Sequence, residues 1–249
     1  MSQTGIYNTL SSSSFEGMLH VDATGAFSHR QRGMIVVLNG FPGAGKFTIL
    51  KHVKELLPAN NTRLVDNHLL IDPAQAVYPD RQNPEHYELR RKLQEPVFES
   101  ISKLAQDGHV VLMTTCLADN IDMDAALFRE HLAMVRGTDV PLFWVNAHCD
   151  QAVLEQRVRS AERCQSAKMK LTDVGVLQEL VREHRLFQPH ESGGGSARLV
   201  VESLDVSGEM EMSVSRLMDI VGLTPSAEPV TVSSGAGGQA ASDTAIEGT

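Results

Sequence analysis

The sequence predicts an α/β fold in which a parallel sheet lies between two layers of helices. Two observations carry this prediction: short, apolar, β-branched segments alternate with helical patterns along the chain, and a glycine-rich turn joins the first strand to the first helix. These patterns fill residues 33–223, which we interpret as one domain. Residues 1–32 and 224–249 are rich in small and polar residues, so we expect both to be disordered.

The first half of the domain opens with the apolar run 34–38, which is typical of a strand buried on both faces. A helix of about three turns follows the glycine-rich turn and ends before Pro58. Residues 63–66 predict a second strand with an acid at its end. Pro84 opens a helical pattern that runs to Leu104, and Pro96 either kinks this helix or divides it in two.

The second half continues the alternation. We expect strands at 110–113, 141–145 and 198–203, and helices at 122–136, directly after Asp150, at 172–187 and before Gly222. Alternation of this kind predicts a parallel sheet with right-handed crossovers.

Charge and cysteine content exclude several classes of protein. The chain holds 22 basic and 31 acidic residues, a net charge of −9, and −6 of this belongs to residues 33–223. An acidic domain binds phosphate backbones poorly, so we expect no nucleic acid partner. Three widely spaced cysteines indicate a reduced protein. Without an apolar run of membrane-spanning length or a signal peptide, we expect a soluble, cytoplasmic protein with no membrane partner.

The glycine-rich turn has the composition of a phosphate-binding loop. It reads Gly40-Phe41-Pro42-Gly43-Ala44-Gly45-Lys46-Phe47-Thr48. Small residues let successive backbone N–H groups point inward, the helix N-terminus adds partial positive charge, and Lys46 can reach the terminal phosphates. The loop therefore predicts a nucleotide site in which Gly40, Gly43, Ala44, Gly45, Lys46, Phe47 and Thr48 contact the ligand.

One position of this loop departs from the general rule. Ser or Thr usually follows the lysine and ligates Mg²⁺, but Phe47 stands there and Thr48 comes next. Adenylate-kinase-type loops, Gly-x-Pro-Gly-x-Gly-Lys-Gly-Thr, also place the threonine second, and the present loop resembles them closely. We therefore expect Thr48 to be the Mg²⁺ ligand.

The loop, the element order and the length resemble the small P-loop kinases of the adenylate, shikimate and gluconate kinase group, which includes chloramphenicol phosphotransferase-like enzymes. The resemblance covers residue 34 to about 222, and the runs 38–43 and 63–73 are similar to a fungal and bacterial branch. It implies a nucleoside-monophosphate-kinase-like P-loop NTPase fold with a five-stranded parallel sheet. It also implies an ATP site, a mobile acceptor region at about 66–95 and an arginine-bearing lid at about 157–170.

Asp66 is the candidate acceptor residue. It ends the second strand, and open α/β sheets bind ligands at the carboxyl ends of their strands. A carboxylate there can orient the acceptor hydroxyl or accept its proton. The third strand is followed by Thr114-Thr115-Cys116, without an acid, so the carboxylate that holds Mg²⁺ through water is expected to be Asp66 or, as an alternative, Asp119. The competing interpretation of Asp66 is a helix cap or a surface residue.

Three further side chains are candidates for substrate binding. Arg90 and Arg91 lie on the helix that flanks the acceptor in similar kinases, where an arginine can grip an anion bidentately. Alternatively, they form a solvated face balanced by neighbouring glutamates. His68 follows Asp66 closely and lines the same pocket or, equally, is a core histidine. The charge of the substrate therefore stays open.

Residues 157–170 carry a local charge of +4, from five basic residues and Glu162. Cationic side chains stabilise the charge that spreads over a transferring phosphoryl group. We expect Arg157 and Arg163 to contact phosphate, with a solvated basic helix end as the alternative. Gln165, Ser166 and Ala167 have the small, polar character of a mobile lid tip.

These residues together predict a kinase that uses ATP and Mg²⁺ to phosphorylate a hydroxyl of a small molecule. A nucleotide-binding module without an acceptor, with a structural or regulatory role, is the alternative. A nucleic-acid motor is disfavoured by the single domain and its acidic charge. The acceptor, the choice between ATP and GTP, and the oligomeric state, monomer or homodimer, stay open.

Overall fold

The computed structural model describes residues 20–21, 27–28, 33–80, 83–165, 168, 170–189 and 197–223. In the N-terminal segment, β1 (His20–Val21) and β2 (Phe27–Ser28) pair antiparallel. The rest of residues 1–32 and the tail 224–249, both predicted to be disordered, lie outside the described residues, as do Ser166 and Ala167 of the predicted lid tip.

The centre of the domain is a five-stranded parallel sheet, which confirms the predicted fold class. Its strands are β3 (Met34–Asn39), β4 (Thr62–Val65), β5 (Val110–Thr115), β6 (Pro141–His148) and β7 (Arg198–Asp205). They lie in the order β4-β5-β3-β6-β7, and every neighbouring pair is parallel. All carboxyl ends therefore meet at one edge of the sheet, with β3 in the middle.

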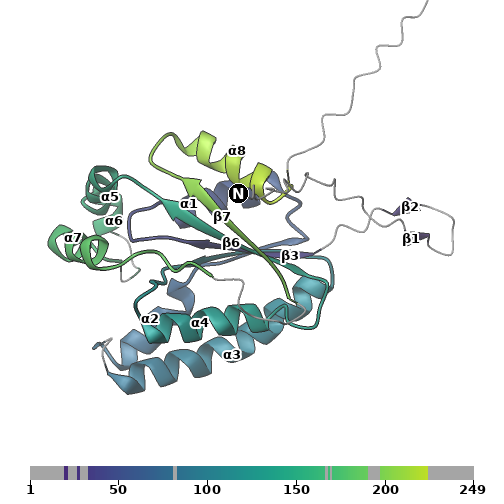
Figure 1. Cartoon of the computed structure of the whole chain (residues 1–249), viewed down its shortest axis with the longest axis horizontal. Coiled ribbons are helices and arrows are strands. Elements are labelled where there is room, and N and C mark those ends of the chain that lie inside the picture. Colours follow the sequence, from purple (N-terminus) through teal and green to yellow (C-terminus); the bar gives the residue numbers. More distant parts are fainter. Residues whose placement is uncertain are drawn as a thin grey trace, which may run out of the picture.

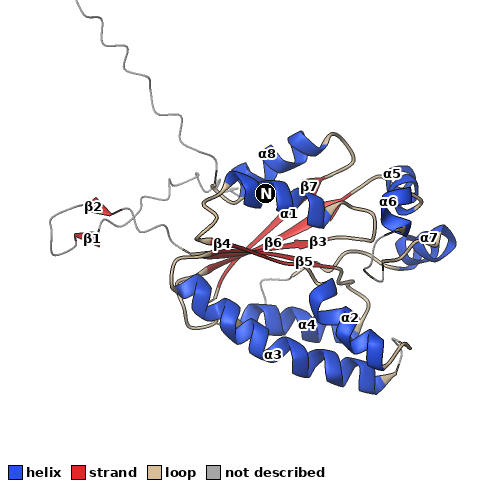
Figure 2. Cartoon of the chain, turned by 180° about the vertical axis from the view of Figure 1, so that it is seen from behind, coloured by secondary structure: helices blue, strands red, loops and turns tan. Residues whose placement is uncertain are grey.

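Helices cover both faces of this sheet (Figures 1 and 2). One face carries α1 (Lys46–Leu56) and α8 (Met210–Ile220), and the other carries α2 (His68–Val77), α3 (Pro84–Gln106) and α4 (Asp122–Ala133). Three more helices gather at one end of the sheet: α5 (Gln151–Val158), α6 (Ala161–Cys164) and α7 (Val174–Glu183). Among the described residues, no helix is long and apolar enough to cross a membrane.

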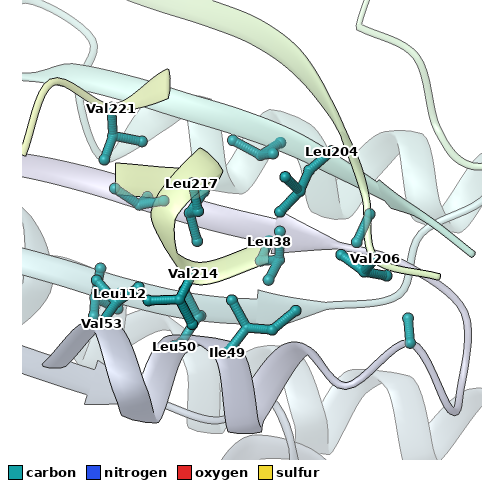
Figure 3. Close-up of a cluster of buried hydrophobic side chains, with 14 of the residues drawn as sticks. Leu38, Ile49, Leu50, Val53, Leu112, Leu204, Val206, Val214, Leu217 and Val221 are labelled. Carbon is teal, nitrogen blue, oxygen red and sulfur yellow. The ribbon is translucent and has the colours of Figure 1, made fainter. Parts of the chain in front are cut away.

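The apolar run of β3 is continuous because both of its faces are buried. Val36 and Leu38 join the cluster that α1 and α8 complete (Figure 3). Ile35 and Val37 join a second cluster beneath α3 and α4, which includes Trp144. A strand buried on one face shows apolar residues at every second position. Because β3 is buried on both faces, its apolar residues follow one another without alternation.

One helix decides between two predicted alternatives, and another was not predicted. Pro96 does not divide the long helix, because α3 runs unbroken for 23 residues, with Phe98 and Ile101 buried just beyond the proline. The predictions also missed α2, a ten-residue helix with Pro73 in its interior. Proline removes one helical hydrogen bond, and packing of the buried apolar face of α2 against α3 offsets that loss.

Candidate functional site

The glycine-rich loop lies between β3 and α1, at the carboxyl edge of the sheet. Gly43 and Gly45 have φ angles of 93° and 77°, a left-handed conformation that side chains rarely adopt. At Gly43 a Cβ atom would also lie 2.9 Å from the carbonyl oxygen of Leu154. The tight curl of the loop, and its close approach to α5, therefore depend on glycine.

Lys46 begins α1 and folds back over the loop. Its Nζ atom donates to the carbonyl oxygens of Gly40 (2.5 Å) and Phe41 (3.0 Å). Burial lowers the pKa of Lys46 below its ordinary value, and the positive charge of Arg163 acts in the same direction, while Cys116 and Asp66 oppose the change. Asp66 and Arg163 thus both lie close enough to Lys46 to influence its charge, as a shared phosphate site requires.

Asp66 directly follows β4 and is only 4% exposed. Its Oδ1 atom accepts a hydrogen bond from the Thr114 hydroxyl (2.8 Å), and its Oδ2 atom pairs with Nζ of Lys168 at 2.5 Å. Burial alone would raise the pKa of Asp66, but the hydrogen bonds from Lys168 and Thr114 outweigh burial and hold it below its ordinary value. The carboxylate is therefore ionised at neutral pH. The alternative of a surface or capping aspartate is wrong, because Asp66 is buried and Asn67 is the N-cap of α2.

Lys168 links the loop to Asp66, a contact that the sequence analysis missed. Its ammonium group lies 3.9 Å from the centre of the Phe47 ring, within the range of a cation–π interaction. The same ammonium pairs with Asp66, which follows β4, whereas the loop follows β3. The only sequence signal for Lys168 was its place in the basic stretch 157–170.

Of the two predicted phosphate contacts, Arg157 lies close to the loop, and Arg163 lies within electrostatic reach of Lys46. The Arg157 guanidinium donates to the carbonyl oxygens of Val206 (3.0 Å) and Gly208 (3.4 Å), and a Cβ atom on Gly45 would lie 3.8 Å from it. Arg163 donates from Nε to the carbonyl oxygen of Leu171 (2.7 Å). Their contact with phosphate stays a prediction.

The structure separates the three predicted substrate residues. His68 pairs with Asp72 one turn along α2 (Nδ1–Oδ1 2.9 Å). Arg90 points toward the end of β4, with Nη2 3.5 Å from Oδ1 of Asn67. Arg91 instead pairs with Glu130 of α4 (Nε–Oε1 3.0 Å), and its side chain is 75% exposed. The structure therefore brings Arg90 and His68, but not Arg91, to the neighbourhood of Asp66.

The side chains present fit a magnesium ion poorly. Mg²⁺ prefers oxygen ligands in a near-octahedral arrangement, but Phe47 offers none, so the exposed Thr48 hydroxyl is the one side-chain oxygen that the sequence 40–48 provides. Both carboxylate oxygens of Asp66 are engaged, and Asp119 accepts a hydrogen bond from the backbone N–H of Gln188. The described residues contain no group of three or more His, Cys, Asp or Glu side chains suited to a metal. Coordination by Thr48 and Asp66 stays a prediction that this arrangement does not favour.

Two buried asparagines, which the sequence analysis also missed, fix the carboxyl edge beside the loop. Asn39 of β3 donates to Asn146 of β6 (2.9 Å) and accepts from the N–H of Leu117 (2.8 Å). Asn146 donates in turn to the carbonyl oxygen of Phe187 (3.0 Å). These bonds tie the segments after β5 and α7 to the two central strands, which keeps the floor of the site rigid.

Comparison with protein families decides the relationship. The family model described as chloramphenicol phosphotransferase-like protein matches residues 33–175, more than half of the chain. The chain belongs to this family. The match spans the loop, Asp66 and the basic stretch, and it ends before β7 and α8, so these two elements are placed by the structure alone.

Solved structures support the fold of this chloramphenicol phosphotransferase-like chain. A sugar kinase from Janibacter sp. HTCC2649 is 17% identical, with 78% of this chain and 96% of that chain covered and a TM-score of 0.50. A protein from Chloroflexus aurantiacus described provisionally as a kinase is 15% identical, with 76% and 98% covered and a TM-score of 0.51. No curated protein sequence matches the chain. The predicted membership of the P-loop kinase-like group is confirmed, whereas the fungal and bacterial branch stays a prediction.

Proposed function

We propose that the chain is an ATP-dependent phosphotransferase that moves the γ-phosphoryl group to a hydroxyl of a small molecule. The observation that carries this proposal is the buried, ionised carboxylate of Asp66, which stands within electrostatic reach of the loop lysine. A loop lysine and a carboxylate on a neighbouring strand are the parts that phosphoryl transfer to an alcohol needs. Membership of a family named for a phosphotransferase supports the same reaction.

The nucleotide phosphates would lie in the curl of Gly40–Gly45 and at the N-terminus of α1. The backbone N–H groups of that curl and the Lys46 ammonium supply the positive potential. Lys46 now donates to two loop carbonyls, and phosphate oxygens would replace these partners. Arg157, which lies beside the loop, and Arg163, which lies within electrostatic reach of Lys46, would stabilise charge on the equatorial oxygens of the transferring group.

In the transfer step the acceptor oxygen attacks the γ-phosphorus, and the bond from that phosphorus to the β–γ bridging oxygen breaks, so that ADP leaves. The hydroxyl proton passes to Asp66 or to solvent. A carboxylate whose pKa is held low is a weak base, and phosphoryl transfer through a loose transition state needs little proton abstraction before bond formation. Asp66 therefore acts mainly by orienting the hydroxyl in line with the γ-phosphate.

The acceptor would approach from the side of α2 and α3. His68 and Arg90 lie near Asp66 there. The Asn67 side chain accepts from Arg90, and its backbone N–H donates to the Thr114 hydroxyl, which also contacts Asp66. Arg91, the other predicted acceptor contact, pairs with Glu130 and is largely exposed, so it is not part of this acceptor site. The charge of the acceptor depends on which of these side chains it meets.

The test is to incubate the purified protein with ATP and a panel of sugars, nucleosides, shikimate-like acids and phenolic alcohols. A mass gain of one phosphoryl group on one acceptor supports the proposal. Asp66→Asn keeps the shape of the side chain and is expected to lower turnover about 100-fold. Asp107→Asn is the matched control, because Asp107 is exposed and lies before the amino end of β5, whereas Asp66 lies at the carboxyl edge of the sheet. Full turnover by Asp66→Asn would exclude the role assigned to Asp66.

A nucleotide-binding module without an acceptor is the second candidate. The ion pair between Lys168 and Asp66 favours it, because this pair occupies the carboxylate that an acceptor would need. Under this alternative, Lys46→Ala abolishes nucleotide binding, but no compound in the panel accelerates ADP release. An acceptor that accelerates ADP release at least tenfold excludes the alternative.

A further inference from the structure

We propose that the Lys168 ammonium takes the place of a divalent cation between the phosphate-binding loop and Asp66, so that this chain binds nucleotide without a metal ion. The proposal rests on the nucleotide site assigned above and concerns the cation that accompanies the phosphates. It adds Lys168 and Phe47 to the residues of that site.

The position of the ammonium carries the argument. In the general form of the loop, the residue after the lysine offers a hydroxyl to the metal, and a strand-end carboxylate holds the metal from the other side. Here the residue after Lys46 is Phe47, whose ring faces the Lys168 ammonium at 3.9 Å. The hydroxyl of Thr48 comes one residue later, exposed on the first turn of α1. The same ammonium contacts Oδ2 of Asp66. One protein cation thus joins the phosphate-binding loop to the strand-end carboxylate, the side from which a metal would be held.

The residues around Lys168 suit an ammonium better than a hydrated divalent ion. An aromatic face attracts a monovalent cation but offers no oxygen for coordination. Thr114, in the strand that lacks a terminal acid, donates its hydroxyl to Asp66, so the carboxylate is held by one neutral donor and one cation. Asp66 is 94% buried at the side chain and needs such a partner, because an isolated buried charge is strongly unfavourable.

The charge near the loop is sufficient for a polyanion. Lys46, Arg163 and Lys168 contribute three positive charges close to the loop, and Asp66 contributes one negative charge. The N-terminus of α1 adds partial positive charge. An ammonium has three N–H donors, so one ammonium can contact a carboxylate and a phosphate oxygen at the same time.

The experiment measures the affinity of the full chain for a non-hydrolysable β,γ-imido analogue of ATP, in buffer with EDTA and in buffer with Mg²⁺. For the unaltered protein we expect the two dissociation constants to agree within about threefold. Lys168→Met is expected to weaken binding in EDTA by about tenfold, the effect of losing one charge-assisted hydrogen bond, and Mg²⁺ is expected to restore most of the loss.

Three further variants sharpen the result. Lys168→Arg keeps the charge and should bind in EDTA within about threefold of the unaltered protein. Lys170→Met removes the same charge two residues away, and it should change the affinities in EDTA and in Mg²⁺ by the same factor. Phe47→Ser combined with Lys168→Met restores a hydroxyl at the loop and should make binding depend on Mg²⁺ by at least about tenfold.

Two outcomes would overturn the proposal: a loss of about tenfold or more when Mg²⁺ is removed from the unaltered protein, or an equal loss in both buffers for Lys168→Met. Thermal unfolding of each variant shows whether it is folded, and if Lys168→Met is not, the EDTA comparison on the unaltered protein decides. The assay contains no acceptor. Failure to find a phosphorylated product would therefore count against the proposed kinase and leave the metal result standing.

Discussion

The nucleotide side and the acceptor side of the sheet are built in different ways. The nucleotide side consists of β3, the loop and α1, which follow one another along the chain and rest on an apolar cluster completed by α8. The acceptor side consists of β4, α2, α3 and α4, and it buries polar side chains such as Asp66, His86, Gln94 and His131. The loop of the nucleotide side depends on backbone geometry, whereas the acceptor side depends on the partners and the protonation of buried polar side chains.

This difference decides what each side tolerates. A loop that curls through left-handed glycines fails when a Cβ atom is added, whatever the pH. A buried polar group instead loses stability when its partner is removed or when it must take up a proton. Each side should therefore respond to a different kind of perturbation, and the following experiments test that contrast in order of expected size.

Gly43→Ala should be the most damaging change on the nucleotide side. The left-handed backbone and the 2.9 Å approach of the new Cβ to the Leu154 carbonyl both oppose the substitution, and together they should cost about 4 kcal/mol. Gly137→Ala is the matched control, because Gly137 also has a positive φ but nothing lies within 4 Å of its Cβ position. We expect about 1 kcal/mol there. Denaturant unfolding measures both, and equal losses would contradict the close approach.

His131 should make the acceptor side sensitive to acid. Burial lowers its pKa from 6.5 to about 4, while its Nδ1–H donates to the carbonyl oxygen of Leu127. Between pH 6.5 and 4 this histidine is protonated in the unfolded chain but largely neutral in the folded chain. The free energy of unfolding therefore decreases as the pH is lowered through this range, by about 3 kcal/mol in total. More than about one pH unit above 6.5 the ring is neutral in both states and contributes no slope.

The measurement is the free energy of unfolding as a function of pH. His131→Leu should flatten the profile between pH 6.5 and 4 relative to the unaltered protein. His52→Gln, on the exposed surface of α1, should leave the slope unchanged. A slope that survives in His131→Leu would mean that another group causes the acid sensitivity.

The same contrast explains how far the sequence could predict the molecule. The strands and the loop are local patterns, and the five strands were placed to within a few residues. The contacts of Asp66 were not predictable, since Thr114 lies 48 residues away and Lys168 lies 102 residues away. Helix α2 was missed because Pro73 argues against a helix locally, and only packing on α3 overrides it. Periodicity finds elements, whereas polar partners depend on the fold that assembles them.

Thr114→Val should test how much the hydrogen bonds of one buried hydroxyl contribute to the stability of the acceptor side. The Thr114 hydroxyl donates to Asp66 and accepts from the N–H of Asn67. Its removal leaves the buried Asp66 carboxylate and the half-buried N–H of Asn67 each short of a partner and should cost about 2 kcal/mol. Thr115→Val is the control of the same shape, because the buried Thr115 hydroxyl has no hydrogen-bond partner within the described structure. That variant should be neutral or slightly stabilising, and a similar loss in both would argue that packing, rather than hydrogen bonding, sets the effect.

The smallest effect is expected for Arg91, at the outer limit of the acceptor side. Its ion pair with Glu130 is exposed, and such pairs contribute less than about 1 kcal/mol. Arg91→Ala should therefore barely change the unfolding midpoint, and once an acceptor is known it should change KM by less than about twofold. Arg90→Ala is the matched comparison, because Arg90 is half-buried beside Asn67, and we expect it to raise KM for an anionic acceptor by about tenfold. If Arg91→Ala raises KM as much as Arg90→Ala does, the acceptor extends across α3 to the outer surface and contacts more of the protein than Asp66, His68 and Arg90.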